Sequence, residues 1–147
     1  MPKVLIAEDE LMIADMVAET LVEHGYEVCG IARTVAEAVA LGRQDKPGLA
    51  VIDVRLGDGG LGTEIAARLS AFGRLGVLYA TGNISQVMLT AADGDACLAK
   101  PYRTADLLRG LELVAEIVAT GTASPPFPRG FQVLRPAANP LPESANA

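Results

Sequence analysis

The stretch AVIDVRLGDGG, residues 50–60, contains an apolar run that ends in one acidic residue, Asp53, and then continues into a glycine-rich loop. A short apolar run of this kind predicts a buried strand over residues 49–54. A carboxylate at the end of a buried strand is costly unless it is paired or used. Asp53 is therefore the first candidate functional residue, and its strand is the reference for the rest of the fold.

Further strands and helices alternate on both sides of this strand. Apolar runs predict strands over 3–7, 26–32, 76–80 and 96–99, and helical spacing of apolar residues predicts helices over 11–24, 34–46, 63–72, 84–92 and 104–119. Thr34 and Glu37 form a capping box, and Thr104 is the expected cap of the last helix. Strands joined by helices are parallel, with helices on both faces. We therefore expect an α/β three-layer sandwich.

Composition limits the class of protein. The chain has 147 residues, half of them hydrophobic, and a net charge of −6. It has no apolar run long enough to span a membrane and no signal-peptide pattern, so we expect a soluble cytoplasmic protein. The acidic charge argues against a nucleic-acid surface. The two cysteines, Cys29 and Cys97, have no metal-ligand spacing and are expected to be free thiols.

The residues after the last helix differ in composition. Six of the nine prolines lie in 121–147, so residues 1–120 are expected to form one domain and 121–147 a flexible or polyproline-like tail without an output domain. Phe127, Phe131 and Leu134 are unusual for a disordered tail. Docking of these side chains on the domain or on a partner subunit is the alternative to disorder.

Polar residues follow four of the five predicted strands. Glu8 and Asp9 follow the first, Asp53 ends the third, Thr81 follows the fourth and Lys100 follows the fifth. Each taken alone also fits a plain structural role, such as a helix-start acid, a turn residue or a surface lysine. All of them fall on the rim of the sheet where open α/β proteins bind ligands.

These side chains together predict one kind of chemistry. Three carboxylates in one crevice ionise together only if a cation joins them, and oxygen ligands without His or Cys select a hard ion such as Mg²⁺. A lysine and a hydroxyl beside a free carboxylate suit phosphoryl transfer. Lys100 would neutralise phosphate oxygens, Thr81 would donate a hydrogen bond, and Asp53 would be the nucleophile.

The motifs "AEDE", "YATGN" and "LAKPY", with Asp53 between them, resemble the receiver domain of bacterial two-component response regulators over residues 2–120. The resemblance implies a flavodoxin-like (βα)5 fold with strand order 2-1-3-4-5. It implies Mg²⁺ held by Glu8, Asp9, Asp53 and the backbone carbonyl of Arg55, and a cis peptide bond between Lys100 and Pro101. It also implies phosphorylation of Asp53 by a histidine kinase or histidine phosphotransferase.

Two details refine the resemblance. "YATGN" and "DVRLGDGGLG" look like a single-domain subgroup with an F-A-T-G motif, in which Tyr79 takes the phenylalanine position. Receivers often carry a switch aromatic three residues before the lysine, where this chain has Cys97. The expected switch and output residues are therefore Thr81, Cys97, Pro101 and Tyr102. Tyr102 or Tyr79 would either replace the missing switch aromatic or simply pack in the hydrophobic core.

The glycines that follow Asp53 are expected to permit positive φ angles in a loose loop. Gly57 stands where receivers often have proline, four residues after the phosphoacceptor.

Three functions remain open. The leading one is a phosphoacceptor, itself not an enzyme, whose phosphorylation shifts a surface that binds a downstream protein, as a monomer or homodimer. A pseudo-receiver that only binds partners is the second. The third is a phosphatase with an aspartyl-phosphate intermediate, disfavoured because Arg55 stands where the dehalogenase type has its general acid.

Overall fold

The computed structural model describes residues 2–82 and 88–137 and contains one six-stranded sheet in the order β2-β1-β3-β4-β5-β6. The first five strands are parallel to their neighbours, and β6 is antiparallel to β5. The predicted order 2-1-3-4-5 is confirmed. The strands are β1 (Lys3–Ala7), β2 (Glu27–Ala32), β3 (Leu49–Asp53), β4 (Gly76–Thr81), β5 (Ala96–Ala99) and β6 (Phe131–Val133).

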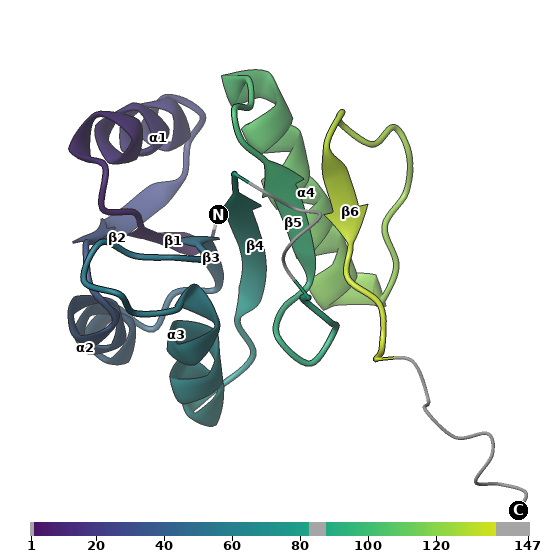
Figure 1. Cartoon of the computed structure of the whole chain (residues 1–147). Coiled ribbons are helices and arrows are strands. Elements are labelled where there is room, and N and C mark those ends of the chain that lie inside the picture. Colours follow the sequence, from purple (N-terminus) through teal and green to yellow (C-terminus); the bar gives the residue numbers. More distant parts are fainter. Residues whose placement is uncertain (1, 83–87, 138–147) are drawn as a thin grey trace, which may run out of the picture.

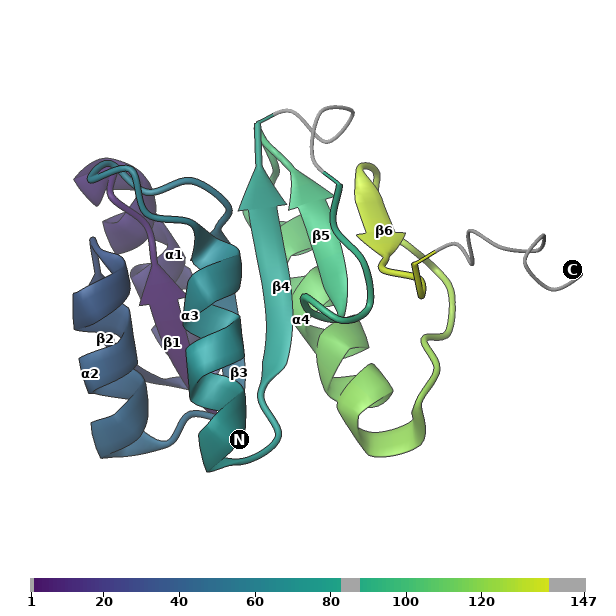
Figure 2. The ribbon, with the colours of Figure 1, turned by 60° about the horizontal axis from the view of Figure 1, so that its bottom comes forward.

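Four α-helices in the described part of the chain cover the sheet as pairs (Figures 1 and 2). α2 (Val35–Asp45) and α3 (Gly62–Leu69) pack on one face, and α1 (Leu11–Glu23) and α4 (Thr104–Thr120) pack on the other. A 3-10 turn over Ser70–Phe72 extends α3. The helices that the structure describes include none that is long and apolar enough to cross a membrane.

The central strands are buried because both faces of the sheet are covered. Val4, Leu5 and Ile6 of β1 are almost completely inaccessible to solvent. Leu5 contributes to the core under α2 and α3, whereas Val4 and Ile6 contribute to the core under α1 and α4. The near-continuous apolar runs in the sequence are therefore the signature of a parallel sheet with two cores.

Only α2 of the four described α-helices begins with a side-chain capping bond. Thr34 Oγ1 accepts a hydrogen bond from the amide of Glu37 at 3.1 Å, as in a capping box, but Glu37 Oε1 accepts at 2.8 Å from the amide of Arg33, the residue before the cap, rather than from that of Thr34. The prediction for the last helix was wrong by one residue. Arg103 is the cap of α4 and Thr104 is its first helical residue, without a side-chain capping bond.

The helix predicted over 84–92 is not present in its described part. Residues 84–87 lie outside the described residues, and residues 88–92 form a loop and a turn. The Asp93 carboxylate accepts a hydrogen bond from the amide of Thr90 at 2.8 Å, and the Thr90 hydroxyl accepts one from the amide of Ala92 at 3.2 Å. Such local side-chain bonds compete with the helical pattern.

The tail folds back as β6. Phe131, Gln132 and Val133 pair with Leu98, Cys97 and Ala96. The predicted order 2-1-3-4-5 would make β5 an edge of the sheet, but β6 lies outside it (Figure 2). Residues 124–135 are therefore docked on the domain, which was the alternative to a disordered tail.

Candidate functional site

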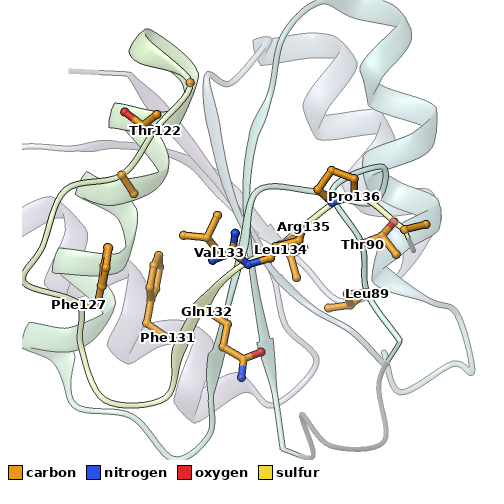
Figure 3. Close-up of a pocket in the computed structure, with 13 residues that line it drawn as sticks. Leu89, Thr90, Thr122, Phe127, Phe131, Gln132, Val133, Leu134, Arg135 and Pro136 are labelled. Carbon is orange, nitrogen blue, oxygen red and sulfur yellow. The ribbon is translucent and has the colours of Figure 1, made fainter. Parts of the chain in front are cut away.

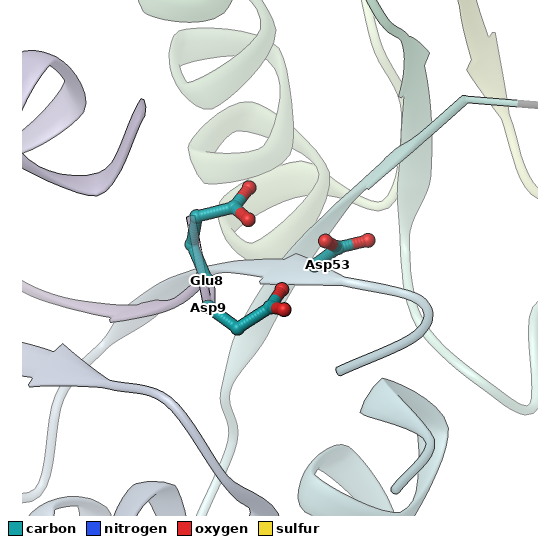
Figure 4. A group of neighbouring side chains, drawn as sticks. All are labelled: Glu8, Asp9 and Asp53. Carbon is teal, nitrogen blue, oxygen red and sulfur yellow. The ribbon is translucent and has the colours of Figure 1, made fainter. Parts of the chain in front are cut away.

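Three carboxylates meet at the carboxyl ends of β1 and β3 (Figure 4). Glu8 and Asp9 directly follow β1, and Asp53 is the last residue of β3, which pairs with β1 in parallel. One carboxylate oxygen from each residue lies within 4.8 Å of the others. Glu8 is buried, while Asp9 and Asp53 are half-buried. The strand pairing thus brings together residues that are more than forty positions apart in the chain.

Lys100 bridges two of these carboxylates. Its ammonium group donates to Glu8 Oε1 at 2.8 Å and to Asp53 Oδ2 at 3.2 Å. Burial alone would lower the pKa of Lys100, but the hydrogen bond to Glu8 and the negative charges of Asp53 and Glu8 raise it above its ordinary value. The lysine therefore remains a cation fixed beside the candidate nucleophile.

Asp53 is held in a partly desolvated position. Burial raises the pKa of its carboxyl, Lys100 opposes the shift, and the Glu8 charge adds to it. The amide of Arg55 lies 3.4 Å from Asp53 Oδ1, the weakest of these contacts. The role of the Arg55 carbonyl as a metal ligand stays a prediction.

The loop after Asp53 is ordered by backbone hydrogen bonds. The amide of Leu56 donates to the carbonyl of Gly60 at 2.9 Å, and Arg55 and Leu61 form an antiparallel bridge. The expectation of positive φ angles is right for Gly59, at +88°, and wrong for Gly57, Gly60 and Gly62. The expectation of a loose loop is also wrong, because of these backbone hydrogen bonds.

The remaining glycines of this loop are needed for close approach. A Cβ atom on Gly57 would lie 2.5 Å from Asp9 Oδ2, and one on Gly62 would lie 2.2 Å from the carbonyl oxygen of Asp53. The loop backbone therefore packs directly against two of the acidic residues. Sequence reasoning missed this positioning role, although the glycine run itself is the signal for it.

Three of the predicted switch residues, Thr81, Pro101 and Tyr102, lie at or just after the carboxyl ends of β4 and β5. Thr81 is the buried last residue of β4, and its carbonyl accepts a hydrogen bond from the amide of Lys100 at 2.9 Å. The Lys100–Pro101 bond is cis, as the resemblance implied. Tyr102 is half-buried, and burial raises its pKa to about 12.

Cys97 and Tyr79 are paired neighbours on β5 and β4 and belong to the same core cluster. Both cysteines are free thiols, as expected. Tyr79 is fully buried, and its hydroxyl donates to the carbonyl of Asp93 at 2.7 Å. The aromatic ring thus belongs to the core beside the position where receivers often carry a switch aromatic.

The donor set of this cluster suits a hard divalent cation. Its side-chain ligands are all carboxylate oxygens. Such ligands favour Mg²⁺ over softer metals, and Mg²⁺ requires only one or two carboxylates because water or phosphate completes its shell. Glu8, Asp9 and Asp53 therefore fit the metal that the resemblance implied.

Comparisons with known proteins agree with this geometry. Residues 4–119 match the sequence profile of the response regulator receiver domain. The chain is 37% identical over 118 residues to the transcriptional regulatory protein PdtaR of Mycobacterium tuberculosis, covering 76% of this chain and 55% of PdtaR. It is 36% identical over 108 residues to the phyllosphere-induced regulator PhyR of Methylorubrum extorquens, covering 71% of this chain and 40% of PhyR. The chain thus spans about half the length of these relatives.

A solved structure shows the same fold. The signal receiver domain of a modulated diguanylate cyclase from Desulfovibrio desulfuricans superimposes with a TM-score of 0.66 and 32% identity, over 79% of this chain and 94% of that domain. The narrower F-A-T-G subgroup stays a prediction. The profile, the relatives and the carboxylate–lysine site agree, and the chain belongs to the response regulator receiver domain family.

Proposed function

We propose that the chain is a phosphoacceptor in two-component or phosphorelay signalling and that Asp53 receives the phosphoryl group. The observation that carries this proposal is the bridge from Lys100 to Asp53 and Glu8, at 3.2 and 2.8 Å, beside the third carboxylate of Asp9. A half-buried lysine fixed between two acids is already positioned to neutralise charge that arrives on Asp53.

The chemistry assigned to each residue follows from its position. A carboxylate oxygen of Asp53 forms a bond to phosphorus while the phosphorus–nitrogen bond of a phosphohistidine breaks, and the imidazole keeps the electron pair and a proton. Lys100 would neutralise the transferred phosphoryl oxygens, and Thr81 would donate a hydrogen bond to one of them.

Glu8, Asp9 and Asp53, with the backbone carbonyl of Arg55, are the proposed ligands of Mg²⁺. When bound, Mg²⁺ supplies positive charge that lets the carboxylates ionise together and that neutralises phosphoryl oxygens. The ionised form of Asp53 is the nucleophile, and the positive charge of Lys100 opposes the rise in pKa that burial and the Glu8 charge impose on it.

The proposed partners follow from the same chemistry. The phosphoryl donor is a histidine kinase or a histidine phosphotransferase, and the output is a protein–protein contact in the cytoplasm by a monomer or homodimer. The chain catalyses only its own phosphorylation and dephosphorylation. Residues 1–120 form the proposed receiver unit, and the segment from residue 121 onward is an appendage to it.

The test is phosphorylation by a small-molecule donor. Incubation with Mg²⁺ and acetyl phosphate is expected to add one phosphoryl mass to the intact chain and to the peptide that contains Asp53. Asp53→Asn should abolish the added mass, and chelation of Mg²⁺ should suppress it. Asp15→Asn, on an exposed position of α1, is the matched control and should be phosphorylated like the unmodified chain.

Other results would contradict the proposal in different ways. No added mass in the presence of Mg²⁺ would favour a pseudo-receiver that only binds partners. Added mass that persists in Asp53→Asn would place the acceptor elsewhere. Repeated turnover of p-nitrophenyl phosphate would favour the phosphatase.

A further inference from the structure

The strand β6 lies along β5 up to the residue before Lys100. Leu98 pairs with Phe131, and the amide of Ala99 donates to the carbonyl of Gly130 at 3.0 Å. Gly130 has φ +78°, and a Cβ atom there would lie 3.1 Å from Cβ of Ala99. The beginning of β6 is therefore fitted closely against the end of β5, where the next residue carries the site lysine.

α4 holds the chain that leads into β6. Arg109 donates from Nε to the carbonyl of Pro126 at 3.0 Å and from a terminal nitrogen to the carbonyl of Ser124 at 2.8 Å. Glu116 accepts hydrogen bonds from both the amide and the hydroxyl of Ser124. Gly110 of α4 faces this segment, since a Cβ atom there would lie in ordinary contact with the ring of Phe131, at 3.6 Å. The segment that leads into β6 is thus held at specific positions on α4.

The far end of β6 holds the loop that leads from β4 to β5. The amide of Leu134 donates to the carbonyl of Asp95 at 3.0 Å, and the amide of Ala91 donates to the carbonyl of Arg135 at 2.8 Å. Leu134 also packs with Leu89 against the core cluster that contains Tyr79 and Cys97. One short segment therefore contacts both the strand that carries Lys100 and the loop that follows the strand of Thr81.

β6 is short and exposed enough to detach from β5. β6 has only three residues, with Gln132 exposed and Phe131 and Val133 half-buried. A cavity of about 840 Å³ separates it from the end of α4, and the stacked rings of Phe127 and Phe131 line that cavity (Figure 3). Short peripheral strands with few buried contacts open at much lower free energy than a whole domain unfolds.

We propose that residues 130–135 form a strand lock on β5, which opens when Asp53 is phosphorylated. This inference rests on the proposed function. A phosphoryl group on Asp53 draws the Lys100 ammonium away from its present bridge, and Ala99 moves with it. The Ala99 amide is hydrogen-bonded to the Gly130 carbonyl at 3.0 Å, so movement of Ala99 breaks the pairing at this end first.

Opening of the lock changes what the protein presents to a partner. It uncovers the paired edge of β5 over Ala96–Leu98 and releases the 88–95 loop, which is held at Ala91 and Asp95. Because coupling between two sites is reciprocal, loosening the lock must also favour the occupied form of the site.

The experiment is amide hydrogen exchange on the full-length chain, with the phosphorylated fraction measured by mass in the same sample. With Mg²⁺ and acetyl phosphate, the amides of Ala99, Leu134 and Ala91 are expected to exchange at least about fivefold faster, while the central strands β1 and β3 remain protected. These three amides donate hydrogen bonds that join residues 130–135 to the rest of the molecule at both ends of the β5–β6 pairing.

A substitution tests the reciprocal direction. Gly130→Ala is expected to speed exchange of the same amides about tenfold in the unphosphorylated chain, because a side chain disfavours this backbone conformation and contacts Ala99. It should also bind beryllofluoride with Mg²⁺ about threefold or more tightly, as linkage requires. Gly25→Ala is the matched control, since Gly25 has φ +90° at the end of α1, far from β6.

The two proposals fail in different ways. A phosphorylated chain with unchanged exchange at Ala99, Leu134 and Ala91 would overturn the lock and leave the phosphoacceptor function intact. The lock is also overturned if Gly130→Ala speeds exchange but binds beryllofluoride like Gly25→Ala. A chain that takes up no phosphoryl mass would refute the phosphoacceptor function itself, together with the trigger of the lock.

Discussion

Replacement of Lys100 by methionine is expected to destabilise the protein strongly and to make its stability depend on Mg²⁺. Methionine keeps most of the apolar stem but removes the charge that bridges Glu8 and Asp53 at 2.8 and 3.2 Å. The side chains of Lys100, Glu8 and Asp53 are only 20%, 6% and 14% exposed, so the two carboxylates would face each other with little solvent screening.

The magnitude follows from this burial. Removal of one partner from a fully buried pair costs about 3–5 kcal/mol, and the residual exposure of Lys100 reduces the expected loss to about 2–4 kcal/mol. A cation at the carboxylates would restore part of it. Mg²⁺ at roughly one hundred times its dissociation constant stabilises the folded state by about 2.7 kcal/mol.

The assay is urea unfolding of Lys100→Met with and without Mg²⁺. Lys3→Met is the matched control, because the Lys3–Glu27 pair spans 3.9 Å with side chains 42% and 69% exposed, and such surface pairs contribute about 0–1 kcal/mol. Equal stability of the two variants in the absence of Mg²⁺ would refute the account of Lys100 as the charge that holds the acidic cluster together.

Gly57→Ala should leave stability nearly unchanged yet weaken Mg²⁺ binding about tenfold, because the new methyl group displaces the flexible end of the Asp9 side chain. Isothermal titration calorimetry measures the affinity for Mg²⁺, and an unchanged affinity would contradict this prediction. Asp95→Asn should lower the free energy of unfolding by about 2–3 kcal/mol in urea titrations. The Asp95 carboxylate accepts hydrogen bonds from Arg74 at 2.7 and 3.3 Å and from the Val77 amide at 2.8 Å. A loss under about 0.5 kcal/mol would argue against a stabilising role of these bonds. Burial raises the pKa of all three tyrosines, Tyr26, Tyr79 and Tyr102, so their contribution to stability is full below about pH 10 and is lost as pH rises through the raised pKa values. Absorbance at alkaline pH should show no tyrosine ionising at its ordinary pKa before the protein unfolds. One such transition in the folded chain would contradict this prediction.

The site was predictable because its residues follow the strands directly. Apolar runs and helical periodicity are strong signals in long segments, and the parallel order then places Glu8, Asp53 and Lys100 on one rim regardless of the details of the loops. The cis bond before Pro101 came from the family resemblance rather than from the residues themselves.

The errors have a common physical cause. Residues 88–92 were predicted to be helical from their apolar content, but the side chains of Thr90 and Asp93 bind the local backbone instead. β6 has three residues, and its stability depends on contacts with α4 and β5 that no local pattern encodes. The proline content led to the prediction of a flexible tail and concealed the strand within it.

β6 also determines where the sheet stops. The strand is three residues long, and it is flanked by Pro128 and Arg129 on one side and by Arg135 and Pro136 on the other. Proline cannot donate to a further strand, and like-charged arginines repel a second copy of the same segment. The outermost strand therefore acts as a terminator of sheet growth. At this edge of the sheet, the residues that flank β6 therefore disfavour edge-to-edge pairing between two copies of the protein.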